Sequence, residues 1–363
     1  MIYRAIGIMS GSSLDGVDIA FVEFTETGGK WSYEIIAADC LAYSDEWRGK
    51  LLTATDLSAL NYQLLHTDYG HYIGNKINEF IETNNLQHRV NLIASHGHTT
   101  FHLPHKKMTA QLGDGAAIAA ETKLPVVSDL RNIDVAFGGQ GAPIVPIGEK
   151  LLFEEYQYFL NIGGIANISI NQRGNYTAFD ICAANRVLNM LAAEKGFDYD
   201  EGGVIASSGD IDRNLLQQLN ALDYYRQPSP KSLANEFGTS VIYPIVKNAG
   251  LSVEDASRTY IEHIALQIQT AIIDNEVSEA NKKMLVTGGG AFNLFLMERL
   301  TVLLKEEEIT IVVPNDQLVQ YKEALIMALM GVLRWREEAN VLSSVTGALQ
   351  NSIGGALWLG TEA

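Results

Sequence analysis

The chain has 363 residues, a formal net charge of −17 at pH 7, and a composition that is 47% hydrophobic and 19% charged. This length exceeds what one compact core usually supports, so we expect two domains. The acidic excess excludes a basic nucleic-acid-binding face and argues against binding to an anionic membrane surface. The two cysteines, Cys40 and Cys182, make neither a disulfide framework nor a zinc site.

The hydrophobic runs predict a cytoplasmic protein. The start of the chain has one Arg and no long apolar stretch, so no signal peptide is expected. The longest apolar candidate, residues 324–332, is too short to span a bilayer, which takes about 20 residues.

The first predicted unit is a strand, a loop and a second strand. Apolar runs at residues 2–9 and 17–24 flank the sequence GIMSGSSLDGVD at residues 7–18. This pattern is typical of a β-hairpin whose loop turns backbone N–H groups and hydroxyls toward an anion, although an ordinary Ser/Gly-rich turn is an equal alternative. A Walker P-loop is excluded because the chain contains no Gly-Lys-Ser or Gly-Lys-Thr.

Helices are predicted at residues 44–55 and 58–82, followed by a strand at 90–95 that leads into a histidine-rich loop. The i,i+4 spacing of His98 and His102 raises the question of zinc. Pro104 breaks any helix there, so we expect His96 to hydrogen-bond a ligand, and His102 and His105 to lie at the surface.

Arg131 follows a further predicted strand, residues 126–128, which ends at Asp129. An Arg between Asp129 and Asp134 suits a polyol or carboxylate ligand, because guanidinium binds paired oxygens. A salt-bridged turn explains the same residues equally well.

A second region begins near residue 131 and repeats the first pattern. Strands at 159–162, 165–170 and 176–179 are separated by a Gly163-Gly164 turn and a polar turn. Two such copies predict two similar domains that face a cleft. Helices are expected through much of 185–275, and again at 293–304 after a strand at 284–287. The final segment, 345–358, is expected to be a helix that returns to the first domain.

Asp180 ends the third strand of this region and has apolar neighbours, Phe179 and Ile181. Such surroundings raise a carboxyl pKa and improve a general base. A helix N-cap is the simpler alternative. For Cys182, a buried structural thiol is favoured over a nucleophile.

Two glycine turns and one helical glutamate complete the candidates. Gly163-Gly164 suits a phosphate-contacting turn or a plain hairpin. The run Gly288–Gly290 before Asn293 could let an adenosine lie against bare backbone. Alternatively, these glycines only permit tight packing between the strand and the helix. Asn293 stands where a Rossmann motif would have its third Gly. Glu323 is by default a solvated helix residue.

Taken together and in order, ten stretches of the chain resemble the anhydro-N-acetylmuramic acid kinase family. They are residues 7–18 (GIMSGSSLDGVD), 95–97 (SHG), 111–114 (QLGD), 129–131 (DLR), 138–143 (GGQGAP), 161–167 (NIGGIAN), 179–180 (FD), 287–293 (TGGGAFN), 322–324 (KEA) and 344–348 (SVTGA).

The resemblance implies an α/β, two-lobed actin-like ATPase fold, which is a duplicated ribonuclease H-like fold with a central interdomain cleft. Residues 1–129 and 341–363 would form the N-terminal lobe, with the phosphate hairpin and part of the sugar site. Residues 130–340 would form the C-terminal lobe, with the adenosine site and the catalytic Asp.

The resemblance also implies the cofactors ATP and Mg²⁺ and a set of site residues. Asp180 would be the catalytic base. The sugar would lie near His96, Thr99, Arg131 and Glu323. The nucleotide would be bound by Gly11, Ser12, Ser13, Asp15, Gly16, Asp18, Asn161, Gly163, Gly164, Gly288, Gly289, Gly290 and Asn293.

The reaction implied for the family is unusual for a kinase. Water opens the 1,6-anhydro bridge of the sugar while the freed O6 takes the γ-phosphate, giving N-acetylmuramate 6-phosphate and ADP in peptidoglycan recycling. Members of the family often pair as dimers, so the expected partners are a small sugar and a second copy of the chain, with no nucleic acid and no membrane.

The chain departs from the family pattern in three places. Residues 181–185 read Ile-Cys-Ala-Ala-Asn, where the family has Thr-Gly-Pro-Gly-Asn. His98 replaces a usual Gln, and residues 326–328 read Ile-Met-Ala for Ala-Phe-Ala. A kinase for a related anhydro or amino sugar is therefore one alternative, and a non-catalytic nucleotide-binding sensor of the same fold is another. A phosphatase of that fold is a third, which the sequence supports less.

Overall fold

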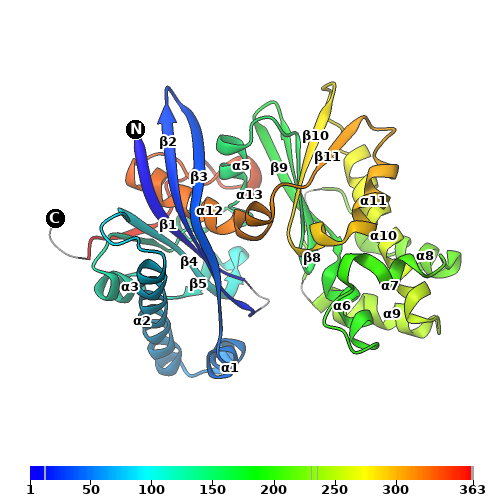
Figure 1. Cartoon of the computed structure of the whole chain (residues 1–363), viewed down its shortest axis with the longest axis horizontal. Coiled ribbons are helices and arrows are strands. Elements are labelled where there is room, and N and C mark those ends of the chain that lie inside the picture. The colour runs from blue at the N-terminus through cyan, green and yellow to red at the C-terminus, as the bar shows by residue number, and fades with distance from the viewer. Residues whose placement is uncertain (12–13, 230, 235, 361–363) are drawn as a thin grey trace. The chain divides into compact units, whose positions relative to one another are not determined.

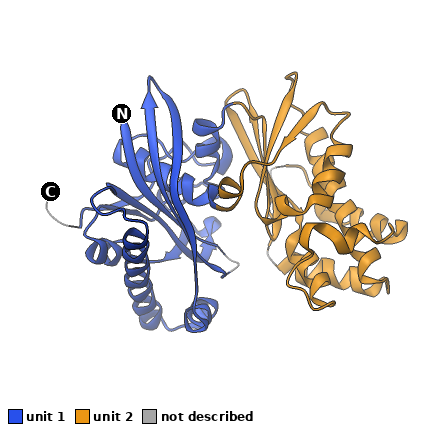
Figure 2. Ribbon diagram, viewed as in Figure 1, with its two compact units in different colours: residues 1–154, 321–363 blue, residues 155–320 orange. Residues whose placement is uncertain are grey.

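The computed structural model describes residues 1–11, 14–229, 231–234 and 236–360. Ser12 and Ser13, both expected in the phosphate loop, lie outside these described residues. The chain forms two compact units (Figure 2). Unit 1 contains Met1–Glu154 and Tyr321–Ala363, and unit 2 contains Glu155–Gln320. Each unit is described by itself.

Unit 1 is built on a mixed sheet with strand order β12-β6-β4-β1-β2-β3, in which β5 also pairs with β4 (Figure 1). Strands β1, β2 and β3 form an antiparallel meander, and β4 runs parallel to β1. The strands are β1 (Ile2–Ser10), β2 (Gly16–Thr27), β3 (Lys30–Ala42), β4 (Leu92–Leu103), β5 (Met108–Leu112), β6 (Val126–Ser128) and β12 (Ala356–Trp358).

Two helices of unit 1 begin at serine caps. Ser44 and Ser58 each accept a hydrogen bond from a backbone N–H three residues later, which fixes the starts of α1 and α2. The helices are α1 (Asp45–Leu52), α2 (Ala59–Thr83), α3 (Gly115–Thr122), α4 (Asn132–Ala136), α5 (Pro146–Leu152), α12 (Asp316–Trp335) and α13 (Ser343–Thr346).

Helix α12 packs closely on the sheet of unit 1, and two glycines make this approach possible. A Cβ on Gly7 of β1 would meet the backbone oxygen of Ala324, and a Cβ on Gly331 would lie 2.6 Å from Cβ of Ala94 in β4. Residues 324–330 are all buried. This packing fixes the position of Glu323 in unit 1.

Unit 2 has a sheet of order β11-β10-β7-β8-β9. Its strands are β7 (Tyr158–Ile162), β8 (Ile165–Gln172), β9 (Asn175–Ala183), β10 (Lys282–Thr287) and β11 (Ile309–Val312). Its helices are α6 (Asn185–Ala193), α7 (Val204–Ser207), α8 (Arg213–Asn220), α9 (Tyr243–Asn248), α10 (Val253–Ile273) and α11 (Leu294–Leu303), with a π-helix, η5 (Phe237–Ile242).

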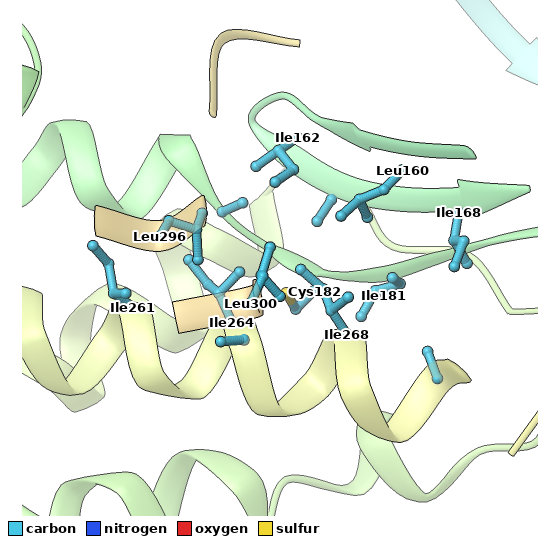
Figure 3. Packing of buried hydrophobic residues seen from close by; sticks show 14 of the residues in the cluster. Leu160, Ile162, Ile168, Ile181, Cys182, Ile261, Ile264, Ile268, Leu296 and Leu300 are labelled. Carbon is cyan, nitrogen blue, oxygen red and sulfur yellow. The ribbon is translucent and has the colours of Figure 1, made fainter. Parts of the chain in front are cut away.

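The core of unit 2 lies between its sheet and helix α10 (Figure 3). Ile162 and Ile168 from the strands and Ile264 and Ile268 from α10 belong to this one cluster, and all four are fully buried. Cys182 belongs to the same cluster, and burial raises the pKa of its thiol far above the usual range. Cys182 is therefore a core residue, as favoured above.

The two units repeat one topology. In each, three strands form an antiparallel meander, and the first strand of the meander carries two further parallel strands on its other side. These added strands are β4 and β6 in unit 1, and β10 and β11 in unit 2. The predicted doubling is confirmed, and the fold is the duplicated ribonuclease H-like fold of the actin-like ATPases.

Several boundaries differ from those expected. The units divide at 154/155 and 320/321 rather than at 129/130 and 340/341, because α4 contacts β5, α5 contacts β3, and α12 packs on β1 and β4. The segment 345–358 is not a helix. It leaves α13 at Gly347, whose φ is +75°, and ends in strand β12, which does pair with β6 of the first sheet.

Strands β4 and β9 are longer than expected. The first continues to Leu103 and the second to Ala183, so Asp180 lies inside a strand rather than at its end. Among the described residues, no helix is both long and apolar enough to cross a membrane.

Candidate active site

The hairpin between β1 and β2 brings two acidic side chains close together. Asp15 is exposed just before β2, and Asp18 lies in β2 opposite Met9. Gly16 has a packing reason of its own, because a Cβ there would lie 2.7 Å from the backbone oxygen of Leu41 in β3. Gly11 follows directly after β1.

Asp18 has a carboxyl pKa raised to about 6. Burial is the main cause, and the nearby charges of Glu323 and Asp15 add to it, while a hydrogen bond from the thiol of Cys40 opposes it. A cation beside these carboxylates would relieve their repulsion, so the donor set suits a hard divalent ion.

His96 and Arg131 form a directly bonded pair. The Nε of Arg131 donates to Nε2 of His96 at 2.7 Å, and Nδ1 of His96 donates to the backbone oxygen of Gly97 at 2.8 Å. Burial and the charge of Arg131 lower the pKa of His96 to about 3, so this imidazole is neutral. Arg131 is therefore oriented without losing its charge.

Among the described residues Arg131 has no ion pair with Asp129 or Asp134, so the alternative of a salt-bridged turn is not supported. Its Nη1 donates to the backbone oxygen of Gly141 at 2.7 Å. Asp134 instead accepts from the backbone N–H of Gly141 and from the hydroxyl of Thr346. Burial lowers the pKa of Arg131 to about 10, and the charges of Glu323 and Asp134 oppose that shift. The guanidinium remains cationic at neutral pH.

Glu323 lies near this pair and is not the solvated helix residue expected by default. It is partly buried, and burial raises its carboxyl pKa against the opposing charges of Lys322 and Arg131. Lys322 itself is buried and paired with Glu149 at 3.1 Å. Unit 1 thus brings together His96, Arg131 and Glu323 from three elements distant in sequence.

Thr99 and the remaining histidines lie further along β4. Thr99 is exposed, and its hydroxyl accepts from Nε2 of Gln111 at 3.4 Å. His98 contacts the hydroxyl of Ser10 at 3.0 Å, and His102 contacts the hydroxyl of Thr109 at 3.1 Å. In the described part of the chain, no three His, Cys, Asp or Glu side chains are arranged to hold a metal ion.

Asp180 in unit 2 is bonded through its backbone and through Oδ2 to one later segment of the chain. Its Oδ2 accepts from the backbone N–H of Leu233 at 2.8 Å and from the hydroxyl of Ser232 at 3.3 Å. Its N–H donates to the backbone oxygen of Lys231, and its backbone oxygen accepts from the hydroxyl of Tyr224. Nothing in the sequence pattern pointed to this segment.

Burial raises the pKa of the Asp180 carboxyl, while the bonds from Leu233 and Ser232 oppose the shift. The upward direction expected from the apolar neighbours is therefore confirmed. The N-cap alternative is wrong, because Asp180 lies in β9 and the N-cap position of α6 is taken by Ala184.

Asp180 belongs to a row of polar residues that crosses four strands. Thr287, Asn161, Asn167 and Asp180 are register partners from β10 through β7 and β8 to β9. Register partners point to the same face of a sheet. The hydroxyl oxygen of Thr287 is buried and has no hydrogen-bond partner among the described residues. Asn167 and Thr287 lie in the stretches 161–167 and 287–293 that resemble the family, but they were not predicted as site residues.

The Gly163-Gly164 turn, the triple-glycine run and the start of α6 meet at Asn185. The backbone N–H of Asn185 donates to the oxygen of Gly163 at 3.0 Å, and its side chain donates to the oxygen of Ile162. A Cβ on Gly289 would lie 3.6 Å from Nδ2 of Asn185. These glycines therefore lie around one point of unit 2.

The three consecutive glycines differ in their surroundings. A Cβ would lie 2.6 Å from Asn161 Oδ1 at Gly288, whose φ is +80°, and 2.3 Å from the side chain of Ile162 at Gly290. Tight packing therefore accounts for both. Gly289 is less crowded, because an added Cβ would only touch Nδ2 of Asn185 at 3.6 Å. Asn293 caps α11, accepting from the N–H of Leu296 at 3.0 Å.

Comparison with known proteins gives a consistent result. The family model described as anhydro-N-acetylmuramic acid kinase matches residues 3–360. An anhydro-N-acetylmuramic acid kinase of Mannheimia succiniciproducens is 33% identical over 361 residues, covering 94% of this chain and 95% of the relative. An anhydro-N-acetylmuramic acid kinase of Aliivibrio fischeri is 37% identical over 313 residues, covering 82% of this chain and 83% of the relative. One of Sulfurovum is 34% identical over 369 residues, with 98% and 99% covered.

Solved structures of low similarity also align along most of the chain. An activator of the 2-hydroxyisocaproyl-CoA dehydratase from Clostridium difficile, with bound ADPNP, gives a TM-score of 0.45 at 14% identity, covering 92% of this chain and 96% of that one. A ROK family glucokinase from Streptomyces griseus, in complex with glucose and AMPPNP, gives a TM-score of 0.41 at 12% identity. That alignment covers 91% of this chain and 99% of the glucokinase chain. On the family match and the three relatives, the chain belongs to the anhydro-N-acetylmuramic acid kinase family.

Proposed function

We propose that this chain is an ATP-dependent kinase that opens the 1,6-anhydro bridge of anhydro-N-acetylmuramic acid with water and phosphorylates the freed O6. Family membership supports the substrate and the reaction type. The observation that carries the proposal is the Asp180 carboxylate, which is oriented by two hydrogen bonds and has a raised pKa. Those are the properties of a general base.

The bridged sugar dictates what the base must do. Its O6 is tied up in an acetal, so there is no free hydroxyl for a kinase base to deprotonate. Asp180 takes a proton from water, and the water oxygen bonds to the anomeric carbon as the bond from that carbon to O6 breaks. The freed O6 then attacks the γ-phosphorus, and the bond from phosphorus to ADP breaks. Both hydrogen bonds to the carboxylate end on Oδ2, so Oδ1 is the oxygen that accepts the proton.

The phosphate chain of ATP is assigned to the glycine turns. At Gly163 and Gly164 the nearest atoms to an added Cβ are 3.6 Å away, so the bare backbone can be approached closely. Gly289 offers similar space for the adenosine. We assign Gly11 and Asp15, on the hairpin of unit 1, to the γ-phosphate side.

Mg²⁺ is assigned to the carboxylates of Asp15 and Asp18. The raised pKa of Asp18 reflects burial and uncompensated negative charge, which a divalent cation relieves. Mg²⁺ is usually held by one or two carboxylates together with substrate phosphates. When bound, it neutralises charge that develops on the phosphoryl group.

The sugar is assigned to His96, Thr99, Arg131 and Glu323. The muramic lactyl group carries a carboxylate, and Arg131 provides a fixed cation for it because neutral His96 holds the guanidinium in place. We assign Glu323 and Thr99 to the hydroxyl and amide groups on the sugar ring.

A kinase for a related anhydro or amino sugar is the second candidate, and it rests on the altered segment 181–185. Cys182, Ala183 and Ala184 are buried in the core of unit 2. Their side chains therefore fill the interior, which favours the family substrate over a changed one. A non-catalytic sensor fits less well, because Asp180 is present and oriented. We place the enzyme in the cytoplasm, where ATP is available, as a homodimer that binds no nucleic acid.

The proposal is tested by measuring ADP release from Mg²⁺-ATP in the presence and absence of the purified anhydro sugar. Sugar-dependent ADP release is expected. Asp180→Asn should reduce turnover by about a hundredfold to ten-thousandfold, because general base catalysis typically contributes that much. ATP binding should remain. Asp198→Asn, in the same unit, serves as the control. Turnover near the wild-type rate in Asp180→Asn would mean that another group is the base.

A further inference from the structure

Arg186 is fixed beside the Gly163-Gly164 turn by the backbone of the residues before it. The N–H of Ala184 donates to the oxygen of Gly164 at 2.8 Å, and the N–H of Asn185 donates to the oxygen of Gly163 at 3.0 Å. Arg186 is the second residue of α6. These two bonds therefore fix the backbone just before Arg186 against the turn.

The guanidinium of Arg186 lies along this turn. A Cβ on Gly164 would lie 3.6 Å from Nε and 3.9 Å from Nη2 of Arg186. On another side, a Cβ on Gly238 of η5 would lie 3.7 Å from Cδ. The side chain is thus held between two glycines, with its charged end at Gly164.

This guanidinium has unused hydrogen-bonding capacity. Its Nε is buried and has no hydrogen-bond partner among the described residues. No Asp or Glu of the described residues lies within ion-pair distance of it, in contrast to Arg258 and Arg299, which share Glu262. A buried donor without a partner destabilises a protein, and such groups call for an explanation.

The position of Arg186 is unfavourable for the apo protein on electrostatic grounds. The first turn of a helix carries partial positive charge and favours anions, so a cation there is repelled. Ala184 at the N-cap position has no side chain that could bond to this helix end. Arg186 and the start of α6 therefore both favour a bound anion.

We propose that Arg186 binds the phosphate chain of ATP, donating from its guanidinium to phosphate oxygens that lie against Gly163 and Gly164. Neither glycine is crowded, because the nearest atoms to an added Cβ lie 3.6 Å away, and at Gly164 they belong to Arg186 itself. A guanidinium donates to two phosphate oxygens at once. This inference rests on the proposed function as an ATP-using kinase and adds a nucleotide-binding residue to it. Sequence analysis assigned no role to this position.

The test is calorimetric titration of the whole protein with ATP, ADP and adenosine, for wild type, Arg186→Gln and Arg186→Lys. We expect Arg186→Gln to weaken ATP and ADP binding by about tenfold to a hundredfold, the effect of a lost charge-assisted hydrogen bond, and to leave adenosine binding unchanged. Arg186→Lys keeps the charge but loses the second bond, so a smaller loss is expected.

Arg213→Gln is the matched control, because Arg213 is an exposed arginine in the first turn of α8 in the same unit. It should bind all three ligands as wild type does. The melting temperature of Arg186→Gln should be unchanged or higher, since an unpaired cation is removed.

Each other outcome has a definite meaning. If wild type binds none of the nucleotides, the proposed function is wrong. If wild type binds ATP and Arg186→Gln binds it equally well, Arg186 does not contact the phosphates. If Arg186→Gln loses adenosine and ATP affinity alike, Arg186 supports the loop structure only, and the inference is again wrong.

Discussion

The orientation of Asp180 depends on residues that come much later in the chain, at sequence separations of 44 to 53. Tyr224, Ser232 and Leu233 bond to its backbone or carboxylate. The family resemblance predicts Asp180 as the catalytic base, and that role stays a prediction. Its hydrogen-bond partners were not predictable, since hydrogen bonds between distant segments leave no local periodicity in a sequence.

The Ser232 hydroxyl gives a pH prediction. Its bond to Oδ2 stabilises the ionised form of Asp180, so Ser232→Ala should raise the pKa of that carboxyl further. The base works only when it is ionised, and therefore the acid limb of kcat/KM should move to higher pH. A shift between a few tenths of a unit and about one unit is expected.

The pH profile of sugar-dependent ADP release measures this shift. Ser229→Ala is the control, because the Ser229 hydroxyl is on the same segment but bonds to Asn275. An unmoved acid limb in Ser232→Ala would mean that Asp180 does not set the limb.

Arg131→Lys gives a second prediction at this scale. Lysine cannot reproduce the fork by which Arg131 donates to His96 and to the backbone oxygen of Gly141 at once. The KM for the sugar should rise by about tenfold to a hundredfold, with ATP affinity unchanged. Steady-state kinetics with each substrate varied in turn measure both. A rise in the KM for ATP alone would place Arg131 in the nucleotide site instead.

At the scale of elements, the glycines after β10 differ in how tightly they are packed. Gly290 fits against Ile162 of β7, whereas an added Cβ on Gly289 would meet only Nδ2 of Asn185, at the ordinary contact distance of 3.6 Å. One local sequence pattern therefore contains a packing glycine and a candidate ligand-binding glycine side by side. The sequence alone left these two explanations open for the whole run.

Substituting each glycine separates the two roles. Gly290→Ala should lower the free energy of unfolding by about 1–3 kcal/mol, because its Cβ would lie 2.3 Å from Ile162. Gly289→Ala should leave that free energy nearly unchanged and weaken adenosine binding. Urea unfolding and calorimetry measure these effects. Equal stability of the two variants would contradict the packing role of Gly290.

The confirmed secondary-structure predictions are those that rest on patterns within a short stretch of sequence. The β7–β8 hairpin follows from apolar runs around Gly163-Gly164, and α2 follows from the Ser58 cap and its apolar spacing. The C-terminal segment was misassigned, because β12 owes its strand structure to pairing with β6, more than 200 residues earlier. Strand β9 runs past Asp180 for a different reason, because its last residues Cys182 and Ala183 pair with Ala166 and Ile165 of the neighbouring strand β8.

At the scale of the whole molecule, an acidic protein has to bind an anionic nucleotide. The formal net charge of −17 repels ATP at long range, and so binding depends on local cations and backbone donors. In the proposed site these are Mg²⁺, assigned to the carboxylates of Asp15 and Asp18, and the backbone of the Gly163-Gly164 turn.

Removal of the metal should therefore have a large effect. With EDTA in excess, turnover should fall to background and ATP affinity should drop by at least about tenfold, while adenosine binding stays the same. Added Mg²⁺ should restore both. Calorimetry and ADP release measure this. Undiminished turnover in EDTA would rule out the assignment of Mg²⁺ to Asp15 and Asp18.

The central claim is that Asp180 directs water to the anomeric carbon while O6 is phosphorylated, and one measurement tests it most directly. The reaction is run with Mg²⁺-ATP and 1,6-anhydro-N-acetylmuramic acid in ¹⁸O-labelled water, and the sugar product is analysed by mass spectrometry. The account predicts one ¹⁸O at the anomeric position and none in the phosphate. A phosphorylated product without the label, or with the label in its phosphate, would contradict it.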